Sequence, residues 1–355
     1  MHQYLGMCCI AKNETPFLEE WIAYHTLMGV EAFVIYDNDS DEPIRDTLRR
    51  LADECFITII PVRGRGKQTE CYDHCLKTYG ASFSWIGFID LDEFVVPKHY
   101  ADLRLLLMQY EHVAGVALHW MQFGSNGHRT RPAGLQIENY TRSIPTAEPG
   151  NWHVKLFVQP SRIKYFYNPH MACCLPGHSI VNTAGQPVRA ALSRPPVWDV
   201  CQINHYYYRS SQDWYQKMRR SRGSTTLKHK VPERIQLPHG DVEDLSAARC
   251  APLVRTLLQQ DAACAAYARR LDVPDTPEAT ALFIAELLQR EALYDGLIVL
   301  RKAHLQFPDN AIIRALLTQS LPLWEGLGIP CPGIVQKTEP PSPDEPKNSR
   351  PVQNM

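Results

Sequence analysis

Short apolar runs alternate with helical patterns over the first hundred residues. The apolar runs predict strands at Leu5 to Ile10, Phe33 to Tyr36, Phe56 to Ile60 and Trp85 to Ile89. Apolar residues at helical spacing predict helices at Thr15 to Met28, Ile44 to Ala52 and Gln68 to Tyr79. Strand–helix alternation at this spacing is typical of βαβ units, so the pattern predicts an α/β domain with a mostly parallel, Rossmann-like sheet.

The pattern changes along the rest of the chain. Strands are predicted at Val113 to Met121 and Val154 to Val158, within a loop-rich segment (122–205) of the kind that often carries specificity. Residues 243–320 read as helical, and 296–317 resembles half of a tetratricopeptide-type helix pair. The six prolines in 331–355 predict a disordered tail. We therefore expect a domain over 1–240, a helical C-terminal region over 241–330 and a tail over 331–355.

Charge and composition narrow the class of protein. Lys plus Arg number 37 and Asp plus Glu 38, which is unlike the strongly basic balance of a nucleic-acid binder. We find no apolar run of about 18 residues and no secretory pattern at the start. Eleven cysteines, an odd number without a Cys-x-x-Cys spacing, favour reduced thiols and a cytoplasmic location.

The strongest chemical signal is an apolar strand that ends in carboxylates, at Asp90, Asp92 and Glu93. Ligands of open α/β sheets bind beyond the carboxyl ends of strands. A turn there could direct two carboxylates at one Mg²⁺ or Mn²⁺ ion. Solvated acids are the commoner outcome for an isolated Asp-x-Asp, but the apolar flanks and the strand end favour a metal site.

Three loops carry weaker signals. Asp37, Asn38 and Asp39 follow the second strand and could bind a base or a ribose, or form a plain surface turn. In the segment from Lys12 to Glu14, the last acid could cap the next helix. The segment from Arg63 to Gln68 combines basic residues with glycines before a helix, which suits a diphosphate or a mobile loop equally well.

Several segments together resemble a known family. They are AKNE at 11–14, EWIAYHTLMGVEAFVIYDNDSDE at 20–42, CYDHCLKTYGASFSWIGFIDLDEFVVP at 71–97, WMQFGSNGH at 120–128, VKLFVQP at 154–160 and INHYYYRSSQDWYQKMRRSRG at 203–223. In this order they resemble the bacterial family-2-like and family-92-like glycosyltransferases, over roughly residues 5–225. The resemblance implies a GT-A fold and a hexosyltransferase-type enzyme that takes a nucleotide-sugar donor and a divalent metal. Family habit makes a UDP-sugar the first choice of donor.

The resemblance also implies roles for single residues. Metal and donor diphosphate would lie at Asp90 and Asp92, with Glu93 beside them as a catalytic candidate. His205 is the candidate further metal ligand, and His170 is the second choice. Donor contacts would come from Lys12, Asn13, Glu14, Asp37, Asn38, Asp39, Arg63, Gln68, Lys217 and Arg220. The sugar or acceptor pocket would be formed by Trp120, Gly124, Ser125 and Gly127.

Some choices stay open. The general base is unassigned, with Asp199, Glu138 and Glu148 as the available acids. A zinc site from His170, Cys173, Cys174 and His178 is disfavoured, because adjacent cysteines do not easily share one tetrahedral ion. The basic stretch 209–234 could grip donor phosphates or an anionic acceptor, or form a solvated face near the inner membrane surface, where glycan assembly often occurs.

Two rival functions remain beside glycosyl transfer to a carbohydrate or other hydroxyl acceptor. A sugar-nucleotide pyrophosphorylase-like nucleotidyltransferase should carry a basic, Gly-rich loop after the first strand, where this chain has Lys12, Asn13 and Glu14. A non-catalytic binding scaffold should not need an intact Asp90-Leu91-Asp92. Metal-dependent nucleotide binding separates the scaffold from the enzyme.

Overall fold

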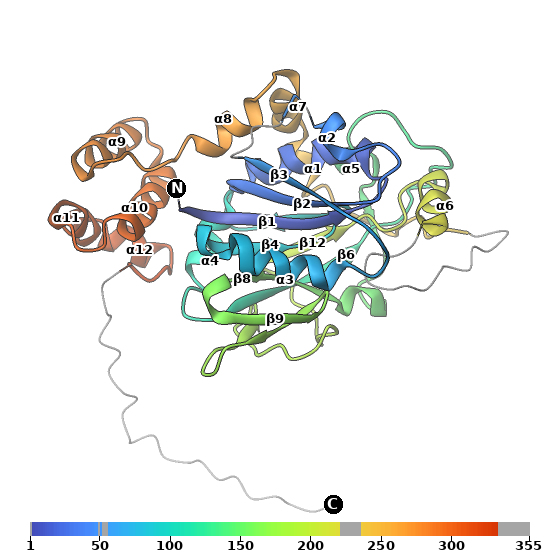
Figure 1. Cartoon of the computed structure of the whole chain (residues 1–355), viewed down its shortest axis with the longest axis horizontal. Coiled ribbons are helices and arrows are strands. Elements are labelled where there is room, and N and C mark those ends of the chain that lie inside the picture. The colour runs from blue at the N-terminus through green and yellow to red at the C-terminus, as the bar shows by residue number, and fades with distance from the viewer. Residues whose placement is uncertain (1, 49, 52–55, 221–235, 333–355) are drawn as a thin grey trace, which may run out of the picture.

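A nine-stranded mixed sheet forms the centre of the computed structural model, which describes residues 2–48, 50–51, 56–220 and 236–332 (Figure 1). Its strand order is β3-β2-β1-β4-β8-β6-β12-β5, with β11 paired to β6. The strands are β1 (Gln3–Ala11), β2 (Ala32–Asn38), β3 (Ile57–Val62), β4 (Phe83–Phe88), β5 (Glu93–Pro97), β6 (Gly115–Gln122), β8 (Val154–Val158), β11 (Ile180–Asn182) and β12 (Cys201–His205).

The first half of the sheet is parallel, as the sequence predicted. β1 pairs in parallel with β2 and β4, and β2 with β3. The connecting helices are α1 (Thr15–Leu27), α2 (Ile44–Thr47) and α3 (Gln68–Tyr79), and the end of the predicted second helix lies partly outside the described residues. The α/β class with a parallel, Rossmann-like first half is thereby confirmed.

The two faces of this half are both buried. Phe33 and Ile35 of β2 join the apolar cluster that contains α1, whereas Val34 and Tyr36 join the cluster that contains α3. Successive side chains of a strand point to opposite faces, so both sets must be apolar when helices cover both sides. This double burial explains why the strands appear in the sequence as continuous apolar runs.

The chain turns at the acidic motif, where the sequence allowed a turn, and then forms β5, a strand that the sequence did not predict. The backbone N–H of Glu93 donates to the carbonyl of Asp90 at 3.0 Å, and β5 then runs antiparallel to β12. β4 itself pairs with β8 on its other side. The motif therefore occupies a turn between the parallel half of the sheet and its second half.

The second half of the sheet carries shorter elements. The hairpin of β9 (Ile163–Asn168) and β10 (Met171–Cys174) lies against α3, where Asp73 accepts a hydrogen bond from the backbone N–H of Phe166 at 2.7 Å. Helix α6 (Ser211–Arg219) is capped by Ser210, whose hydroxyl oxygen accepts from the backbone N–H of Asp213. Smaller elements are α4 (Leu103–Met108), α5 (Gln136–Asn139), β7 (Arg142–Ser143) and β13 (Val242–Glu243), with short 3₁₀ turns at Gly80–Ser82, Pro149–Trp152, Pro160–Arg162 and Ala248–Cys250.

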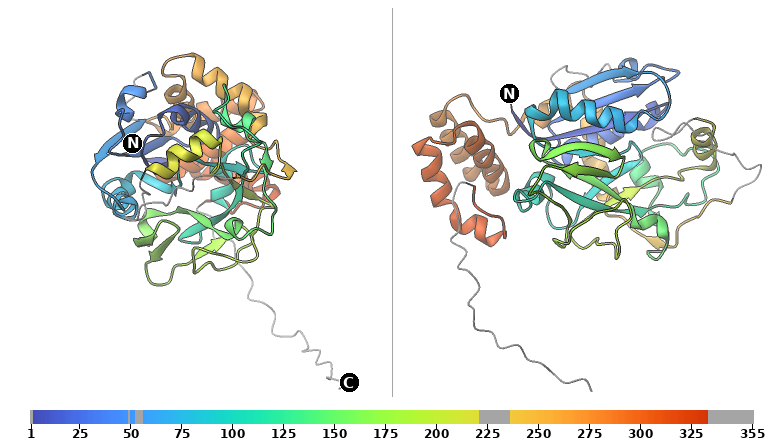
Figure 2. Two further views of the ribbon diagram at one scale, coloured as in Figure 1. Left: turned by 90° about the vertical axis from the view of Figure 1, so that its right-hand side faces the viewer. Right: turned by 60° about the horizontal axis from the view of Figure 1, so that its bottom comes forward.

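The C-terminal region is helical, as predicted. It contains α7 (Ala251–Gln259), α8 (Ala263–Arg269), α9 (Pro277–Gln289), α10 (Leu293–Gln306), α11 (Ala311–Gln319) and α12 (Leu321–Gly326). Helices α7 and α8 lie beside α1, and α9 to α12 form a group at one end of the sheet (Figure 2). One continuous apolar cluster includes Trp21 of α1, Val254 of α7 and Val299 of α10.

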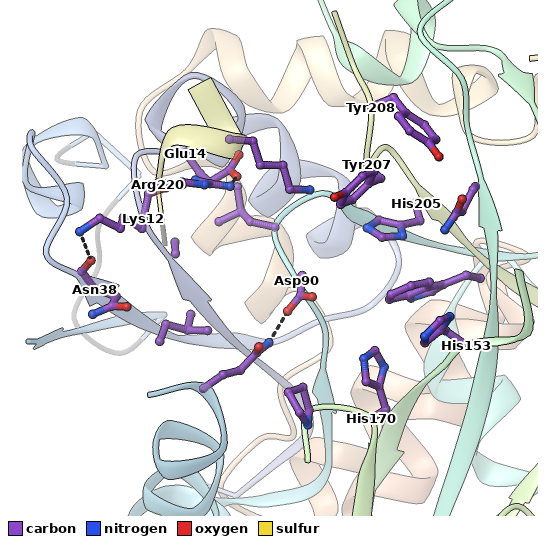
Figure 3. Close-up of a pocket in the computed structure, with 18 residues that line it drawn as sticks. Lys12, Glu14, Asn38, Asp90, His153, His170, His205, Tyr207, Tyr208 and Arg220 are labelled. Atoms are coloured by element: carbon purple, nitrogen blue, oxygen red, sulfur yellow. Dashed lines mark hydrogen bonds and ion pairs between the residues drawn. The ribbon is translucent and has the colours of Figure 1, made fainter. Parts of the chain in front are cut away.

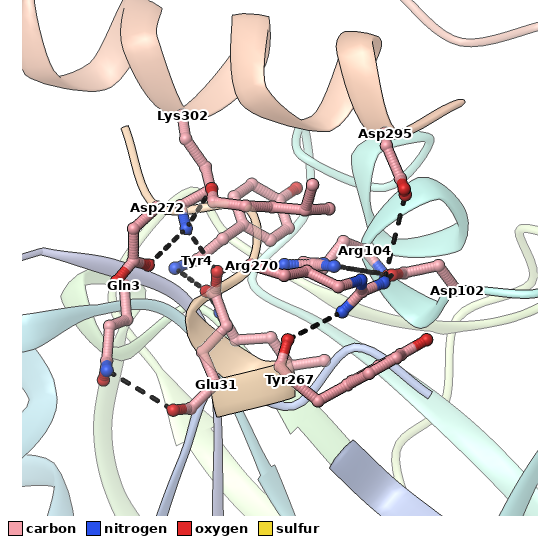
Figure 4. Close-up of polar contacts among 12 residues, drawn as sticks. Gln3, Tyr4, Glu31, Asp102, Arg104, Tyr267, Arg270, Asp272, Asp295 and Lys302 are labelled. Carbon is pink, nitrogen blue, oxygen red and sulfur yellow. Dashed lines mark hydrogen bonds and ion pairs between the residues drawn. The ribbon is translucent and has the colours of Figure 1, made fainter. Parts of the chain in front are cut away.

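Buried ion pairs join this helical region to the sheet domain (Figure 4). Lys302 of α10 places its Nζ 2.5 Å from Glu31 Oε1, and Arg104 of α4 reaches the same oxygen at 3.0 Å. Glu31 also accepts from the backbone N–H of Tyr4 and Leu5. The predicted boundary near residue 240 stays a prediction, but the two regions share one core.

Two further sequence predictions concern membrane spans and the C-terminal tail. Among the described residues, no helix combines the length and the apolar character needed to cross a bilayer. The predicted disordered tail falls almost wholly in 333–355, and this part lies outside the described residues, as do residues 221–235 of the basic stretch.

Candidate functional site

A pocket of about 390 Å³ opens beyond the carboxyl ends of β1, β2 and β4 (Figure 3). Side chains from β6, β12 and the loops before β8 and β10 form its opposite wall, and α6 contributes to its rim. The lining residues are Ile10, Ala11, Lys12, Glu14, Asn38, Gln68, Asp90, Leu91, Trp120, Gln122, His153, Pro169, His170, His205, Tyr207, Tyr208, Lys217 and Arg220. This is the topological position at which open α/β sheets bind ligands.

Asp90 lies on the floor of the pocket, between two polar partners. Its Oδ1 accepts from Gln68 Nε2 at 2.6 Å and lies 2.9 Å from the Nζ of Lys155. Lys155 is fully buried in β8. Burial opposes its positive charge, but Asp90 and Glu93 outweigh burial and raise the pKa of Lys155. The first carboxylate of the motif is therefore fixed by a buried cation.

Glu93 stabilises the turn through a hydrogen bond to its backbone and does not line the pocket. Its Oε2 accepts from the backbone N–H of Asp90 at 2.7 Å and lies 3.8 Å from Lys155 Nζ. Burial raises the pKa of Glu93 well above its usual range, although Lys155 opposes the shift. The side chain is fully buried, so the structure places it as a support of Asp90.

Asp92 points to the opposite side of the turn. Its Oδ2 contacts Lys217 Nζ of α6 and lies 3.5 Å from His205 Nε2. Burial opposes ionisation of Asp92, but Lys217 and His205 outweigh it and lower the pKa of Asp92 well below its usual range. Burial also lowers the pKa of His205, against the attraction of Asp92. The imidazole of His205 is thus neutral near pH 7, the form that ligates metals.

The fit of this site to a divalent ion is partial. Carboxylate oxygens and a neutral imidazole suit Mn²⁺-like ions, and Asp92 and His205 are close enough to share one. Within the described parts of the chain, however, no three His, Cys, Asp or Glu side chains are grouped so as to hold a metal. Asp90 would have to give up its contacts with Lys155 and Gln68 to bind the same ion as Asp92 and His205.

Glu14 is held by two guanidinium groups at the rim. Arg209 Nη1 lies 2.6 Å from its Oε2, and Arg220 contacts its Oε1 and the carbonyl of Lys12. Burial opposes ionisation, but the two arginines outweigh it and lower the pKa of Glu14. Glu14 occupies the N-cap position of α1, as the sequence allowed, but its side chain makes no capping hydrogen bond and pairs with the two arginines instead.

Lys12 and Asn38 connect the loops on the parallel side. Lys12 Nζ donates to the carbonyls of Asn38 at 3.1 Å and Asp39 at 2.7 Å. The side-chain amide of Asn38 donates to the carbonyls of Val62 and Gly64. Both side chains line the pocket, and both also hold the loops that follow β1, β2 and β3 in one arrangement.

The opposite wall is built from aromatic and imidazole rings. Trp120 and His153 stack with ring centroids 4.7 Å apart and an angle of 25°. His205 lies 4.1 Å from Trp120 between centroids, and His170 meets it edge-on at 5.3 Å. Trp120 lines the pocket as the resemblance implied, but with imidazole rings packed against it.

Several predicted site residues lie elsewhere. Asp37 accepts from the backbone N–H of Ser40 and Ile44, and Asp39 from that of Gly64, so both stabilise their loops. Asn13 binds Asp41, and Arg63 is exposed. Gly124, Ser125 and Gly127 lie against residues 238–240. The base candidates are outside the pocket too: Glu138 pairs with Arg255, and Asp199 and Glu148 are exposed.

Sequence reasoning assigned no role to Lys155, His153 or Arg209. A lysine inside the apolar strand VKLFV was a detectable signal, because lysine is seldom buried without a partner. Arg209 was one of many basic residues in its stretch, and its burial against Phe17 depends on tertiary packing. His153 carried no local signal that distinguishes it from the other histidines.

Comparisons with known proteins found similar solved structures and similar sequences. The crystal structure of S. aureus TarS 1-349 is similar over 61% of this chain and 64% of that chain, at 11% identity and a TM-score of 0.35. A glycosyltransferase family 92 protein of Oryza sativa subsp. japonica is 36% identical over 170 residues, which is 46% of this chain and 29% of that protein. One of Arabidopsis thaliana is 38% identical over 97 residues, which is 27% of this chain and 17% of that protein.

The chain thus spans less than a third of the length of these two relatives. The model of the family described as "Glycosyltransferase family 92" matches residues 4–236, which is more than half of this chain and includes every residue that lines the pocket. On this match, the chain belongs to glycosyltransferase family 92.

Proposed function

We propose that this chain transfers a sugar from a nucleotide-sugar donor to a hydroxyl group of a carbohydrate or similar acceptor. The observation that carries the proposal is the turn of Asp90 and Asp92 at the carboxyl end of β4, which faces a pocket rimmed by Lys12, Lys217 and Arg220. Family membership and the pocket's position at the sheet edge support the same reaction.

The cations of the rim are the proposed diphosphate contacts. Lys217 and Arg220 are paired with the carboxylates of Asp92 and Glu14. A diphosphate offers the same cations several anionic oxygens, and charge-assisted bonds to phosphate are strong. UDP is the first nucleotide to test, because the resemblance to the family suggests it.

A divalent metal is the second part of the proposal. Asp92 and His205 would hold it, with Asp90 as the further carboxylate. When bound, Mn²⁺ or Mg²⁺ would act as a Lewis acid on the leaving diphosphate. The chain's own groups would orient the donor through Lys217 and Arg220, and Tyr207 and Tyr208 would exclude water from the same space.

The test is calorimetric titration of UDP, GDP, CDP and dTDP, with and without Mn²⁺. It compares the wild type with a double variant, Asp90→Asn with Asp92→Asn. The control variant is Glu148→Gln with Asp199→Asn, because both acids are exposed and lie outside the pocket. We expect one nucleotide to bind the wild type and the control only with metal, and not to bind the double variant.

Other outcomes would change the proposal in distinct ways. Nucleotide binding that ignores Mn²⁺ but needs the two aspartates would remove the metal and keep the site. Binding that ignores both would show that the pocket is not the donor site. No binding of any nucleotide would favour a non-catalytic scaffold.

A further inference from the structure

The two walls of the pocket differ in the kind of ligand that they suit. Lys12, Lys217 and Arg220 supply positive charge on one side and at the rim. The wall formed by β6, β12 and the loops before β8 and β10 contributes rings and an amide to the lining, namely Trp120, Gln122, His153, Pro169, His170 and His205. Figure 3 shows His153 and His170 across the pocket from Lys12 and Asn38, with Asp90 between the two sides.

The hydrogen-bond partners of His153 and His170 determine their tautomers. His153 Nδ1 lies 3.1 Å from the carbonyl oxygen of Gly150, and His170 Nδ1 lies 2.8 Å from that of Val154. A carbonyl oxygen can only accept, so the proton of each neutral ring must be on Nδ1. Each Nε2 then carries a lone pair.

Both rings remain neutral near pH 7. Burial lowers the pKa of His153, and burial together with Lys155 lowers the pKa of His170 to about 4. Their orientation is also fixed: His153 stacks on Trp120, and the two imidazole centroids are 5.3 Å apart. The backbone N–H of His170 donates to the side chain of Asn168, which holds the turn before β10.

Two neutral acceptors select the chemistry of the ligand. Ionised phosphate has no proton to donate, so it gains nothing from an Nε2 lone pair. Among the described residues, His153 and His170 do not belong to any group of three side chains that could hold a metal ion. Hydroxyl groups donate to such lone pairs, and a sugar carries several of them on one ring.

We propose that His153 and His170 are specificity-determining residues that accept hydrogen bonds from hydroxyl groups of a pyranose ring. This inference rests on the proposed function, because it concerns the same pocket. The ring belongs either to the donor's sugar or to the acceptor, and both present the same hydroxyl chemistry to the two imidazoles.

The experiment compares His170→Asn with His170→Gln in the full chain. An asparagine amide can replace the Nδ1–H that donates to Val154, but it has no atom at the position of Nε2. A glutamine amide oxygen reaches the position of Nε2. The same pair is made at His153, and His178→Asn is the matched control, because His178 is exposed and outside the pocket.

The probes separate the two sources of the ring. The donor arm measures the affinity of UDP-glucose, UDP-galactose and UDP-N-acetylglucosamine relative to UDP. The acceptor arm measures methyl β-galactoside and methyl β-glucoside binding in the presence of UDP. In one arm we expect the asparagine variants to lose about tenfold in sugar affinity, the value of one hydrogen bond to a neutral group, and the glutamine variants to recover part of it. UDP affinity itself should not change.

The opposing results are distinct. Wild-type sugar affinity in both asparagine variants, with UDP binding intact, would overturn this inference and leave the proposed function standing. An equal loss of UDP and sugar binding would reduce the histidines to structural residues and overturn it as well. Failure of the wild type to bind UDP or any of the sugars would remove the proposed function and this inference together.

Discussion

The Nζ of Lys155 lies 2.9 Å from Oδ1 of Asp90, although the two residues are far apart in the chain. Lys155 is fully buried at the second position of β8, and Asp90 is on the turn that follows β4. Glu93 approaches the same ammonium group at 3.8 Å. The acidic motif therefore keeps its shape through a cation that the neighbouring strand supplies.

Replacing Lys155 with methionine should destabilise the fold. The substitution keeps the length of the side chain but leaves Asp90 and Glu93 without their buried cation. Removal of one partner of a buried pair typically costs about 3–5 kcal/mol, and the lower end is expected here because Asp90 is partly exposed. Urea denaturation measures the free energy of unfolding.

Two further variants test the cause of this loss. Adding Asp90→Asn to Lys155→Met should recover part of the stability, since it removes the carboxylate that has lost its cation. Lys164→Met, at an exposed position of β9, should change the free energy of unfolding by less than about 0.5 kcal/mol. Equal effects of the two lysine substitutions would contradict the role given to Lys155.

The fold was predictable where local patterns determine it. The helix at Gln68–Tyr79 and the strand at Val154–Val158 have the predicted bounds. β5 was missed because Glu93–Pro97 follows the motif without a break, and its partner β12 is more than a hundred residues away in the chain. Strand pairing over such a separation leaves no local pattern to read.

Some residues of the site were likewise predictable from the sequence, and others were not. The motif and the resemblance pointed to Asp90, Gln68 and Lys217, which do meet in the pocket. Asp37 had the same local signature as a ligand-binding acid, yet its side chain closes its own turn. The role of His153 comes from packing against Trp120, which belongs to another strand.

Glu20 should make stability depend on pH. Its carboxylate is buried on α1 and accepts from the backbone N–H of Gln136 and Ile137 at 2.8 and 3.0 Å. Burial raises its pKa to about 7, although these hydrogen bonds oppose the shift. Because the folded pKa exceeds the unfolded value, the contribution of Glu20 to stability is complete below pH 4.5 and is lost as the pH rises through 7.

The measurement compares the wild type with Glu20→Gln, which cannot titrate. The wild type should lose about 2 kcal/mol relative to the variant between pH 5 and pH 8, from about 1.4 kcal/mol per pKa unit. The free energy of unfolding is read from urea denaturation at each pH. Glu278→Gln, at an exposed position of α9, is the control. A difference that stays constant over this range would show that Glu20 does not titrate there.

Lys302 should stabilise the sheet domain and the C-terminal helical region together. It pairs with Glu31 and Asp272 in a buried cluster, and the apolar core is continuous across the same junction. We expect Lys302→Met to lower the free energy of unfolding by about 3 kcal/mol. The thermal transition should remain single in the wild type and in the variant, because both regions share one core.

The matched control is Arg314→Met. Arg314 pairs with Asp309 on the surface of the same region, with side-chain exposures of 61% and 89%. Exposed pairs contribute about 0–1 kcal/mol, so this variant should be close to the wild type. Two separate thermal transitions in the wild type would instead indicate that the helical region unfolds on its own.

Lys217 and Arg220 should contribute to nucleotide binding through the phosphates alone. Lys217 is on α6 and contacts Asp92, and Arg220 follows the helix and contacts Glu14. Lys217→Met should weaken UDP binding about tenfold or more, since one charge-assisted hydrogen bond contributes about 1.5–3 kcal/mol, while uridine, which has no phosphate, should bind as it does to the wild type. Titration calorimetry of both ligands gives the comparison, and raised salt should reduce the difference.

Arg219→Met is the control on the same helix, because Arg219 is exposed and does not line this pocket. If uridine and UDP lost equal affinity, Lys217 would act by holding Asp92 and the shape of the site, and the phosphates would need another partner.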